Sequence, residues 1–316
     1  MSKITLMCRV ATTFSKDGGI DEPAQRKFLQ RFVDANLGVY LGSGGQGEGH
    51  TLSKDELRAV YTIGVDVCKG KVPVFANPPE QYTAKSNIEH MQLAVDCGVE
   101  AVNLYAIAGW HSMRPTELEL QVYYDTILTA IKSPIALAAQ PLVGYTIKPS
   151  MIAQLCNKYP HVVTVNLTGV SEAYFLQVKN LIKRPIRFDV PIISSMHTLM
   201  LGATGLLGTE ANIIPKTYRS YIDLYENGNL IEANKVYAQI RRYIDYTAPW
   251  NPGPIRWIKM AMKVLNLPGG EGGIREPYQM PPNEELNRFR DGLLKLNIPE
   301  INELALEAGL KLPPSG

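Results

Sequence analysis

Short apolar segments alternate with longer amphipathic segments over the first 215 residues of the chain. The apolar segments predict buried strands, and apolar residues that recur at helical spacing predict the helices between them. We expect strands at residues 4–12, 39–41, 72–76, 101–107, 135–139, 162–167, 186–190 and 206–209. We expect helices at residues 21–33, 57–67, 86–97, 117–131, 150–158, 171–182 and 196–201.

Local sequence features mark several helix boundaries. Asp21 followed by Pro23 predicts the start of the first helix, because an acidic N-cap and a proline in the first turn both favour initiation. Ser53 with Glu56 three residues later forms the pattern of a capping box. Gly98 predicts a left-handed cap at the end of another helix.

The order of these elements predicts an α/β fold. Eight apolar strands separated by helices and short connections are what a closed, parallel (β/α)8 TIM barrel requires. The alternative is a doubly wound open sheet, which normally carries its phosphate-binding loop after the first strand. Here the glycine-rich turn follows the second strand, so the barrel is favoured. Its functional site would then lie at the carboxyl ends of the strands.

Strands disappear from the pattern after Pro215, and only helical periodicity remains. We expect consecutive helices at residues 218–225, 230–246, 255–265, 283–296 and 301–308. Residues 1–215 are therefore expected to form the barrel core. Residues 216–316 are expected to form the final barrel helix and a C-terminal helical extension.

The segment from Gly38 to Glu56 joins a strand to a helix through a turn with five glycines between Gly42 and Gly49. Glycines let the backbone fold tightly and direct several N–H groups at one point, which suits an anion. Glycine-rich turns also occur where nothing binds. This one matches neither the GxxxxGK[ST] phosphate loop nor the GxGxxG dinucleotide fingerprint.

Composition excludes several classes of function. The formal net charge is only +2, from 32 basic and 30 acidic residues, so we expect no nucleic-acid partner and no membrane partner. Without a secretory signal or a long apolar run, the protein is expected to be cytoplasmic. Four scattered cysteines predict free thiols, and five histidines without ligand spacing predict no metal site. No cofactor is expected.

Four motifs, in order along the chain, resemble one known family. They are VATTFSKDGGIDEPAQRKFL, GEGHTLSKDE, GATGLLGTEANIIP and GPIRWIKMAMKVLNLPGGEGGIREPYQMPP. They are similar to the opening, the glycine loop with its helix, the last barrel strand and the C-terminal helices of the class I aldolases and lyases typified by dihydrodipicolinate synthase and N-acetylneuraminate lyase. The resemblance covers nearly the whole chain and implies a (β/α)8 barrel.

The resemblance implies a mechanism that this sequence does not retain in full. Members of the family form a Schiff base between a lysine at the end of the sixth strand and a 2-oxo acid, and a tyrosine after the fifth strand relays protons. In this chain Asn166 stands at the lysine position and Ala138 at the tyrosine position. The usual arginine beyond Pro141 is missing, and Gly45 and Gln46 replace the paired threonines of the glycine loop.

Candidate site residues are the polar groups that follow the expected strands. We expect catalytic roles for Tyr105, His111 and Glu210, where His111 is alternatively structural or solvated and Glu210 is alternatively paired with Lys216. The expected substrate-binding residues are Gly44, Gly45, Gln46, Gln140, Asn166 and Thr168. Asn166 and Thr168 alternatively satisfy buried backbone groups.

Two classes of function fit these residues. The first is an enzyme that acts on a small 2-oxo or hydroxy acid as a lyase or aldolase without forming an imine. The partners expected for it are this carboxylate substrate and further copies of the same chain. The second is a catalytically inactive barrel that binds a metabolite. A relocated Schiff-base lysine, Lys148 or Lys216, stays open as a variant of the first. The resemblance also implies a homodimer or homotetramer, with Trp110 placed to contribute to the contact.

Overall fold

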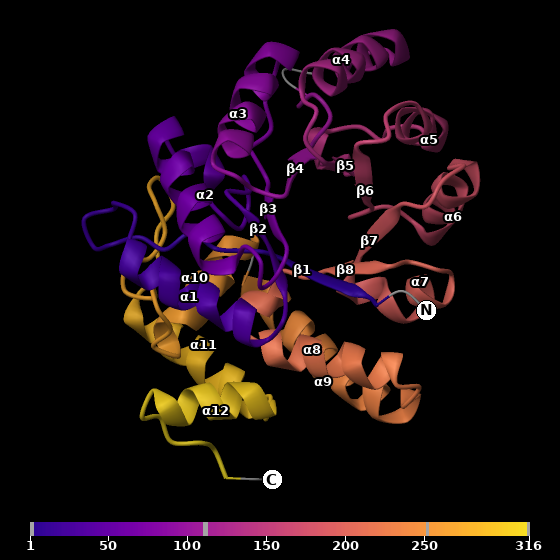
Figure 1. Cartoon of the computed structure of the whole chain (residues 1–316). Helices are drawn as coiled ribbons and strands as arrows, with labels where there is room; N and C mark the ends of the chain where they lie inside the picture. The colour runs from indigo at the N-terminus through magenta and orange to yellow at the C-terminus, as the bar shows by residue number, and fades with distance from the viewer. Residues whose placement is uncertain (1–2, 110–112, 251–252, 315–316) are drawn as a thin grey trace.

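The computed structural model describes residues 3–109, 113–250 and 253–314, and it shows eight parallel strands closed into a barrel in chain order. Figure 1 shows the strands at the centre with helices around them. The strands are β1 (Thr5–Arg9), β2 (Gly38–Leu41), β3 (Val74–Ala76), β4 (Ala101–Leu104), β5 (Ile135–Ala138), β6 (Val162–Asn166), β7 (Arg187–Pro191) and β8 (Gly205–Leu207). The predicted (β/α)8 barrel is confirmed.

Helices α1–α8 follow the strands and form the outer layer (Figure 1). They are α1 (Glu22–Asp34), α2 (Lys54–Cys68), α3 (Ala84–Asp96), α4 (Glu117–Ala130), α5 (Pro149–Lys158), α6 (Glu172–Leu181), α7 (Ser195–Met200) and α8 (Pro215–Glu226). The predicted boundaries hold where the caps are strongest. The side chain of Asp21 accepts a hydrogen bond from the Ala24 N–H, and Ser53 and Glu56 form a complete capping box.

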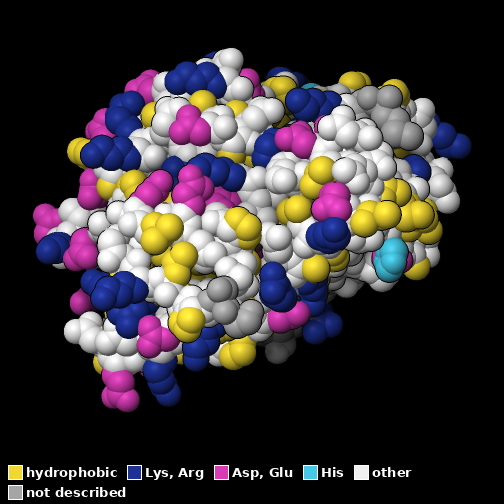
Figure 2. All heavy atoms as spheres, turned by 90° about the horizontal axis from the view of Figure 1, so that it is seen from below, with side chains coloured by type: hydrophobic (Ala, Val, Ile, Leu, Met, Phe, Trp, Pro, Cys, Tyr) yellow, Lys and Arg dark blue, Asp and Glu magenta, His cyan; other side chains and the backbone are white. Residues whose placement is uncertain are grey.

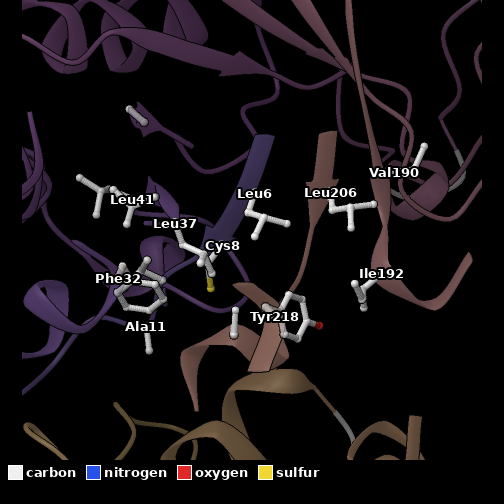
Figure 3. Packing of buried hydrophobic residues seen from close by; sticks show 14 of the residues in the cluster. Leu6, Cys8, Ala11, Phe32, Leu37, Leu41, Val190, Ile192, Leu206 and Tyr218 are labelled. Atoms are coloured by element: carbon white, nitrogen blue, oxygen red, sulfur yellow. The ribbon is translucent and has the colours of Figure 1, made fainter. Parts of the chain in front are cut away.

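The main hydrophobic core lies between the strands and the helices. Side chains alternate along each strand, so every second residue points outward. Figure 3 shows Leu6 and Cys8 of β1 beside Leu206 of β8, with Tyr218 of α8 packed below them. All four are at most 3% exposed, so this layer fixes the positions from which the inward residues project.

The inward residues form a second, unusual layer. Apolar and aromatic side chains fill part of the lumen, namely Met7, Tyr40, Phe75, Ala101, Ala136 and Leu207. TIM-barrel interiors are normally dominated by Val, Ile and Leu. Here the inward positions of the strands also include the buried polar residues Arg9, Asn103, Thr164, Asn166 and Asp189. Such residues are costly to bury unless they have partners or a function.

The C-terminal helices pack beside the barrel, with α9 against α8 and α11 against α10 (Figure 1). They are α9 (Leu230–Thr247), α10 (Pro254–Val264), α11 (Asn283–Lys295) and α12 (Pro299–Glu307). This confirms the expected helical extension. It also brings residues late in the sequence against the loops that follow β1 and β2.

Arg275 fastens the segment between α10 and α11 to these loops. Its guanidinium donates to the carbonyl of Gly18, to the carbonyl of Thr51 and to both carboxylate oxygens of Glu56, with 2.9 Å between Nη1 and Oε2. It also lies 4.5 Å from the centroid of the Phe14 ring. A bidentate guanidinium–carboxylate pair fixes orientation as well as distance. Arg275 therefore holds in place the residues that follow the glycine loop, Thr51 and Glu56.

Replacing Glu56 by glutamine is expected to make the free energy of unfolding depend less on pH in the acid range. The hydrogen bonds from Arg275 lower the pKa of Glu56 to about 2. Because the pKa is lower in the folded state, the carboxylate stabilises the fold fully at pH values above its unfolded-state pKa of about 4.3. This stabilisation is lost as the pH falls towards 2. Because the pair is partly solvated, we expect Glu56→Gln to cost about 1 kcal/mol at pH 7.

Urea unfolding at pH 7 and pH 3 measures this effect. The two proteins should differ clearly at pH 7, and the difference should become smaller at pH 3. An equal difference at both pH values would contradict an ionised Glu56 as the origin of the stabilisation.

Figure 2 shows one face of the molecule, on which basic and acidic side chains are interspersed and not gathered into fields of one sign. Among the described residues, no helix combines the length and the apolar character needed to cross a bilayer.

Candidate functional site

The lumen contains an ion pair on β7, in which the Asp189 side chain is fully buried and the Arg187 side chain is 19% exposed. Arg187 donates two parallel hydrogen bonds to Asp189, with Nε to Oδ1 at 2.8 Å and Nη2 to Oδ2 at 2.9 Å. Burial raises the pKa of Asp189, and Arg187 and then Arg9 counteract it. A β-carbon at Gly205 would lie 2.0 Å from Oδ1, so glycine on β8 makes room for this carboxylate.

Asn166 lies at the carboxyl end of β6, inside the barrel. Its Oδ1 accepts a hydrogen bond from the Tyr40 hydroxyl at 3.3 Å, and its Nδ2 donates to Oδ1 of Asn103 at 2.5 Å. It is only 1% exposed, and Ala138 of β5 lies beside it in the strand register. An amide and a methyl group therefore stand where the resemblance leads one to look for an amine and a phenol.

Arg9 projects into the same lumen from β1 and is 6% exposed. It interacts with the hydroxyl of Tyr105, which also accepts a hydrogen bond from Nδ2 of Asn77 at 3.1 Å. Burial raises the pKa of Tyr105, and Arg9 counteracts this effect. Tyr105 is thus a neutral phenol at the mouth of the barrel, able to donate a proton or a hydrogen bond.

Several buried polar atoms around this mouth have no hydrogen-bond partner within the described protein. They are Nη2 of Arg9, Oδ1 of Asn77, Nδ2 of Asn103, Oε1 of Gln140 and Oγ1 of Thr168. Each unpaired buried group costs free energy, and native proteins keep such groups chiefly where solvent or a ligand meets them. These five residues lie in, or within two residues after, β1, β3, β4, β5 and β6, which makes the mouth the candidate binding site.

The glycine loop provides a second set of free donors. Among the described residues, the backbone N–H groups of Gly44, Gly45 and Gln46 donate no hydrogen bond. Nε2 of the Gln46 side chain donates a hydrogen bond to Oγ1 of Thr209, in the loop after β8, at 3.1 Å. A cavity of about 340 Å³ opens beside the loop, with Gly44, Gly45, His50, Gly253, Ile255, Arg256, Ile274 and Tyr278 in its wall.

Below the loop lies a buried ion pair that sequence reasoning missed. Nζ of Lys259 in α10 is 3.3 Å from Oε1 of Glu48, and both side chains are 0% exposed. The amine also donates to the carbonyl of Thr12 at 2.6 Å and lies 4.6 Å from the centroid of the Phe14 ring. Burial lowers the pKa of Lys259, and Glu48 counteracts it. This lysine ties the loops together and is enclosed by them.

The expectation that Glu210 lies at the pocket needs correction. Its Oε2 accepts a hydrogen bond from the Tyr218 hydroxyl of α8 at 2.5 Å, and burial raises its pKa. It therefore faces the helix layer. The alternative, a pair between Glu210 and Lys216, is also wrong, because the Lys216 amine binds Glu303 of α12 at 2.9 Å and 3.0 Å.

The other candidates are brought together only in part. Asn166 ends β6, and Tyr105, Gln140 and Thr168 follow β4, β5 and β6 within two residues, so all four lie on the side of the barrel where the strands end. Gly44, Gly45 and Gln46 follow β2 on the same side, and Gln46 reaches Thr209 after β8. His111 and Trp110 lie outside the described residues. Lys148 is exposed and pairs with Glu117 of α4, which places its amine on the outer helices.

Arg9, Asn103 and Asp189 are the functional candidates that the sequence reasoning overlooked. Each is a polar side chain at an inward position of a mostly apolar strand, and Asp189 shares its strand with Arg187. A charged or amide side chain at an inward position of a buried strand is the feature that could have identified them. Glu80 was missed as well; its carboxylate packs against Gly44, where a β-carbon would lie 2.8 Å from Oε2. No cluster of metal-ligating side chains occurs within the part of the chain that is described.

Comparison with known proteins agrees with this geometry. The family model described as "Dihydrodipicolinate synthetase family" matches residues 3–295. A 4-hydroxy-tetrahydrodipicolinate synthase of Methanococcus aeolicus is 27% identical over 282 residues, which cover 87% of this chain and 92% of that protein.

Solved structures show the same fold. A putative dihydrodipicolinate synthetase from Pseudomonas aeruginosa superposes with a TM-score of 0.83 at 22% identity, covering 93% of this chain and 100% of the other. YagE from E. coli K12, solved in complex with pyruvate, gives 0.83 at 19% identity and covers 93% of this chain and 98% of that one.

Proposed function

Because the chain belongs to the dihydrodipicolinate synthetase family, we propose that it binds a small 2-oxo or hydroxy acid at the mouth of its barrel and acts on it without forming an imine. Relatives at 27% identity are synthases of this family, which supports aldolase or lyase chemistry. The polar mouth and the free N–H groups of the glycine loop support a carboxylate ligand.

Asn166 is the observation that carries the proposal. An amide nitrogen is not a nucleophile towards a carbonyl carbon, and Asn166 occupies the buried end of β6 with its two amide atoms bound to Tyr40 and Asn103. Lys259 is the one buried lysine among the described residues, and it is enclosed in its pair with Glu48. Lys148 and Lys216 are exposed.

Chemistry without an imine must stabilise the developing negative charge on the substrate oxygen by hydrogen bonds. Tyr105 can donate to such an oxygen, because burial keeps its phenol protonated. Glu80 supplies a carboxylate beside Gly44 and acts electrostatically on Tyr105. We assign proton transfer to these two residues, since an acid and a base must face the same ligand.

Borohydride treatment in the presence of pyruvate tests the absence of an imine. We expect the intact mass of the protein to stay unchanged, while pyruvate raises its melting temperature because the ligand binds only the folded state. A reduced adduct mapped to Lys148, Lys216 or Lys259 would show a relocated Schiff base and overturn the proposal.

A catalytically inactive, metabolite-binding barrel is favoured by one observation. Ala138 lies beside Asn166, so the positions of the family's amine and phenol are both changed. Catalytic groups that act as a unit have non-additive effects, so losing one of them can abolish most of the activity. Proton NMR of pyruvate in D₂O separates the two functions. Enzyme-dependent exchange of the methyl protons indicates proton abstraction by the protein, whereas a melting shift without exchange indicates binding alone.

A further inference from the structure

We propose that Arg9 is the anion-binding residue of the lumen and receives a carboxylate group of the ligand. The inference deepens the proposed function and rests on it for the identity of the ligand as an organic acid. It moves the main anion contact from the glycine loop into the barrel itself.

The charges in the lumen carry the argument. Arg187 and Asp189 neutralise each other through two hydrogen bonds. Arg9 adds a further guanidinium on β1, and among the described residues no carboxylate forms an ion pair with it. Asp189 is thus shared by two guanidiniums, since Arg9 also acts on it electrostatically, while Arg9 itself has no direct ion-pair partner among the described residues. A buried cation without a direct counter-ion is costly.

The free donor of Arg9 points to the same conclusion. Nη2 is buried and has no hydrogen-bond partner, although the guanidinium interacts with the hydroxyl of Tyr105. A guanidinium presents several donors in one plane and matches a carboxylate with two parallel hydrogen bonds. A bound carboxylate would satisfy Nη2 and also give Arg9 a direct counter-ion.

Neighbouring groups define the rest of the anion's surroundings. Nδ2 of Asn103 is a second unpaired buried donor, on β4. Tyr105 directly follows β4, and its phenol hydroxyl interacts with the Arg9 guanidinium. A carboxylate on Arg9 would thus lie beside the acid that we assign to proton transfer, which places the reacting carbon of a short 2-oxo or hydroxy acid within the mouth.

Stability distinguishes a binding residue from a structural one. If Arg9 is retained for ligand binding, Arg9→Met should leave the melting temperature of the ligand-free protein equal or higher, because it removes a buried charge that lacks a direct ion-pair partner and keeps much of the side-chain volume. The same variant should lose the melting shift with pyruvate, with affinity at least about 10-fold weaker. Arg9→Lys keeps the charge but not the fork, and should bind with intermediate affinity.

Bromide provides a probe that does not depend on the identity of the substrate. Crystals of the wild-type protein soaked in sodium bromide should show anomalous density at hydrogen-bond distance from the Arg9 guanidinium, and crystals of Arg9→Lys should show it weakened or displaced. Bromide found only at the N–H groups of Gly44 and Gly45, or absent from the lumen, would overturn the inference. A lower melting temperature of Arg9→Met with an unchanged pyruvate shift would overturn it too.

The two arms separate this inference from the proposed function. Bromide on Arg9 without any response to pyruvate would leave the anion site standing and reject the 2-oxo acid as ligand. A pyruvate response that survives in Arg9→Met and Arg9→Lys would support the proposed function and reject Arg9 as the anchor.

Discussion

Replacing Asn166 by lysine is expected to create a covalent pyruvate adduct that borohydride traps, where the wild-type protein forms none. Position 166 ends β6 inside the lumen and is 1% exposed. Burial and the guanidiniums of Arg9 and Arg187 would lower the pKa of an amine there, and Asp189 would oppose this in part. A free amine at neutral pH is the nucleophile that imine formation needs.

Mass spectrometry of the intact protein and peptide mapping measure this gain. Asn166→Met is the matched control, because it has a similar length and no amine, and it should remain unmodified. Without borohydride we expect the Asn166→Lys protein to turn over pyruvate slowly or not at all, since Ala138 supplies no phenol beside the new amine. An Asn166→Lys protein that binds pyruvate without any adduct would show that the carbonyl does not reach the end of β6.

Replacing Lys259 by methionine is expected to destabilise the protein by about 3–5 kcal/mol, because the change leaves the carboxylate of Glu48 buried without its cation. The backbone N–H of Arg275 still donates to Glu48 at 2.9 Å, but it carries no charge. Loss of the amine also removes the hydrogen bond to the carbonyl of Thr12. Urea unfolding should show a large fall in the midpoint.

The double variant Lys259→Met with Glu48→Gln tests the cause. Removing both charges should recover much of the lost stability, because the penalty arises from one unpaired buried charge. Lys54→Met is the surface control, since Lys54 forms a solvated pair with Glu89 at 2.8 Å and its loss should barely move the midpoint. A double variant as unstable as Lys259→Met alone would argue that packing, not charge, is responsible.

Much of the fold could be read from short stretches of sequence. The cap at Asp21 and the capping box at Ser53 begin α1 and α2, because a cap depends only on atoms a few residues apart. The apolar periodicity alone placed the start of α2 three residues too late, at residue 57. The alternation of apolar strands with amphipathic helices likewise predicted the barrel.

The site was predictable only where it depends on the end of a strand. Asn166, Gln140 and Tyr105 follow or end their strands, and the structure brings all three to the mouth. Glu210 also follows a strand, yet its short helical turn directs it to Tyr218 in the helix layer. The direction of a side chain beyond a strand depends on the loop's path, which no periodicity specifies.

By itself the sequence determined the order of strands and helices and the absence of an amine at position 166, because both are properties of neighbouring residues or of one residue. The tertiary structure alone decided that Lys259 meets Glu48 and that Arg9 shares the lumen with Asp189. Closure of the barrel brings together strands from the two ends of the core, and the charge balance of the lumen exists only after that closure.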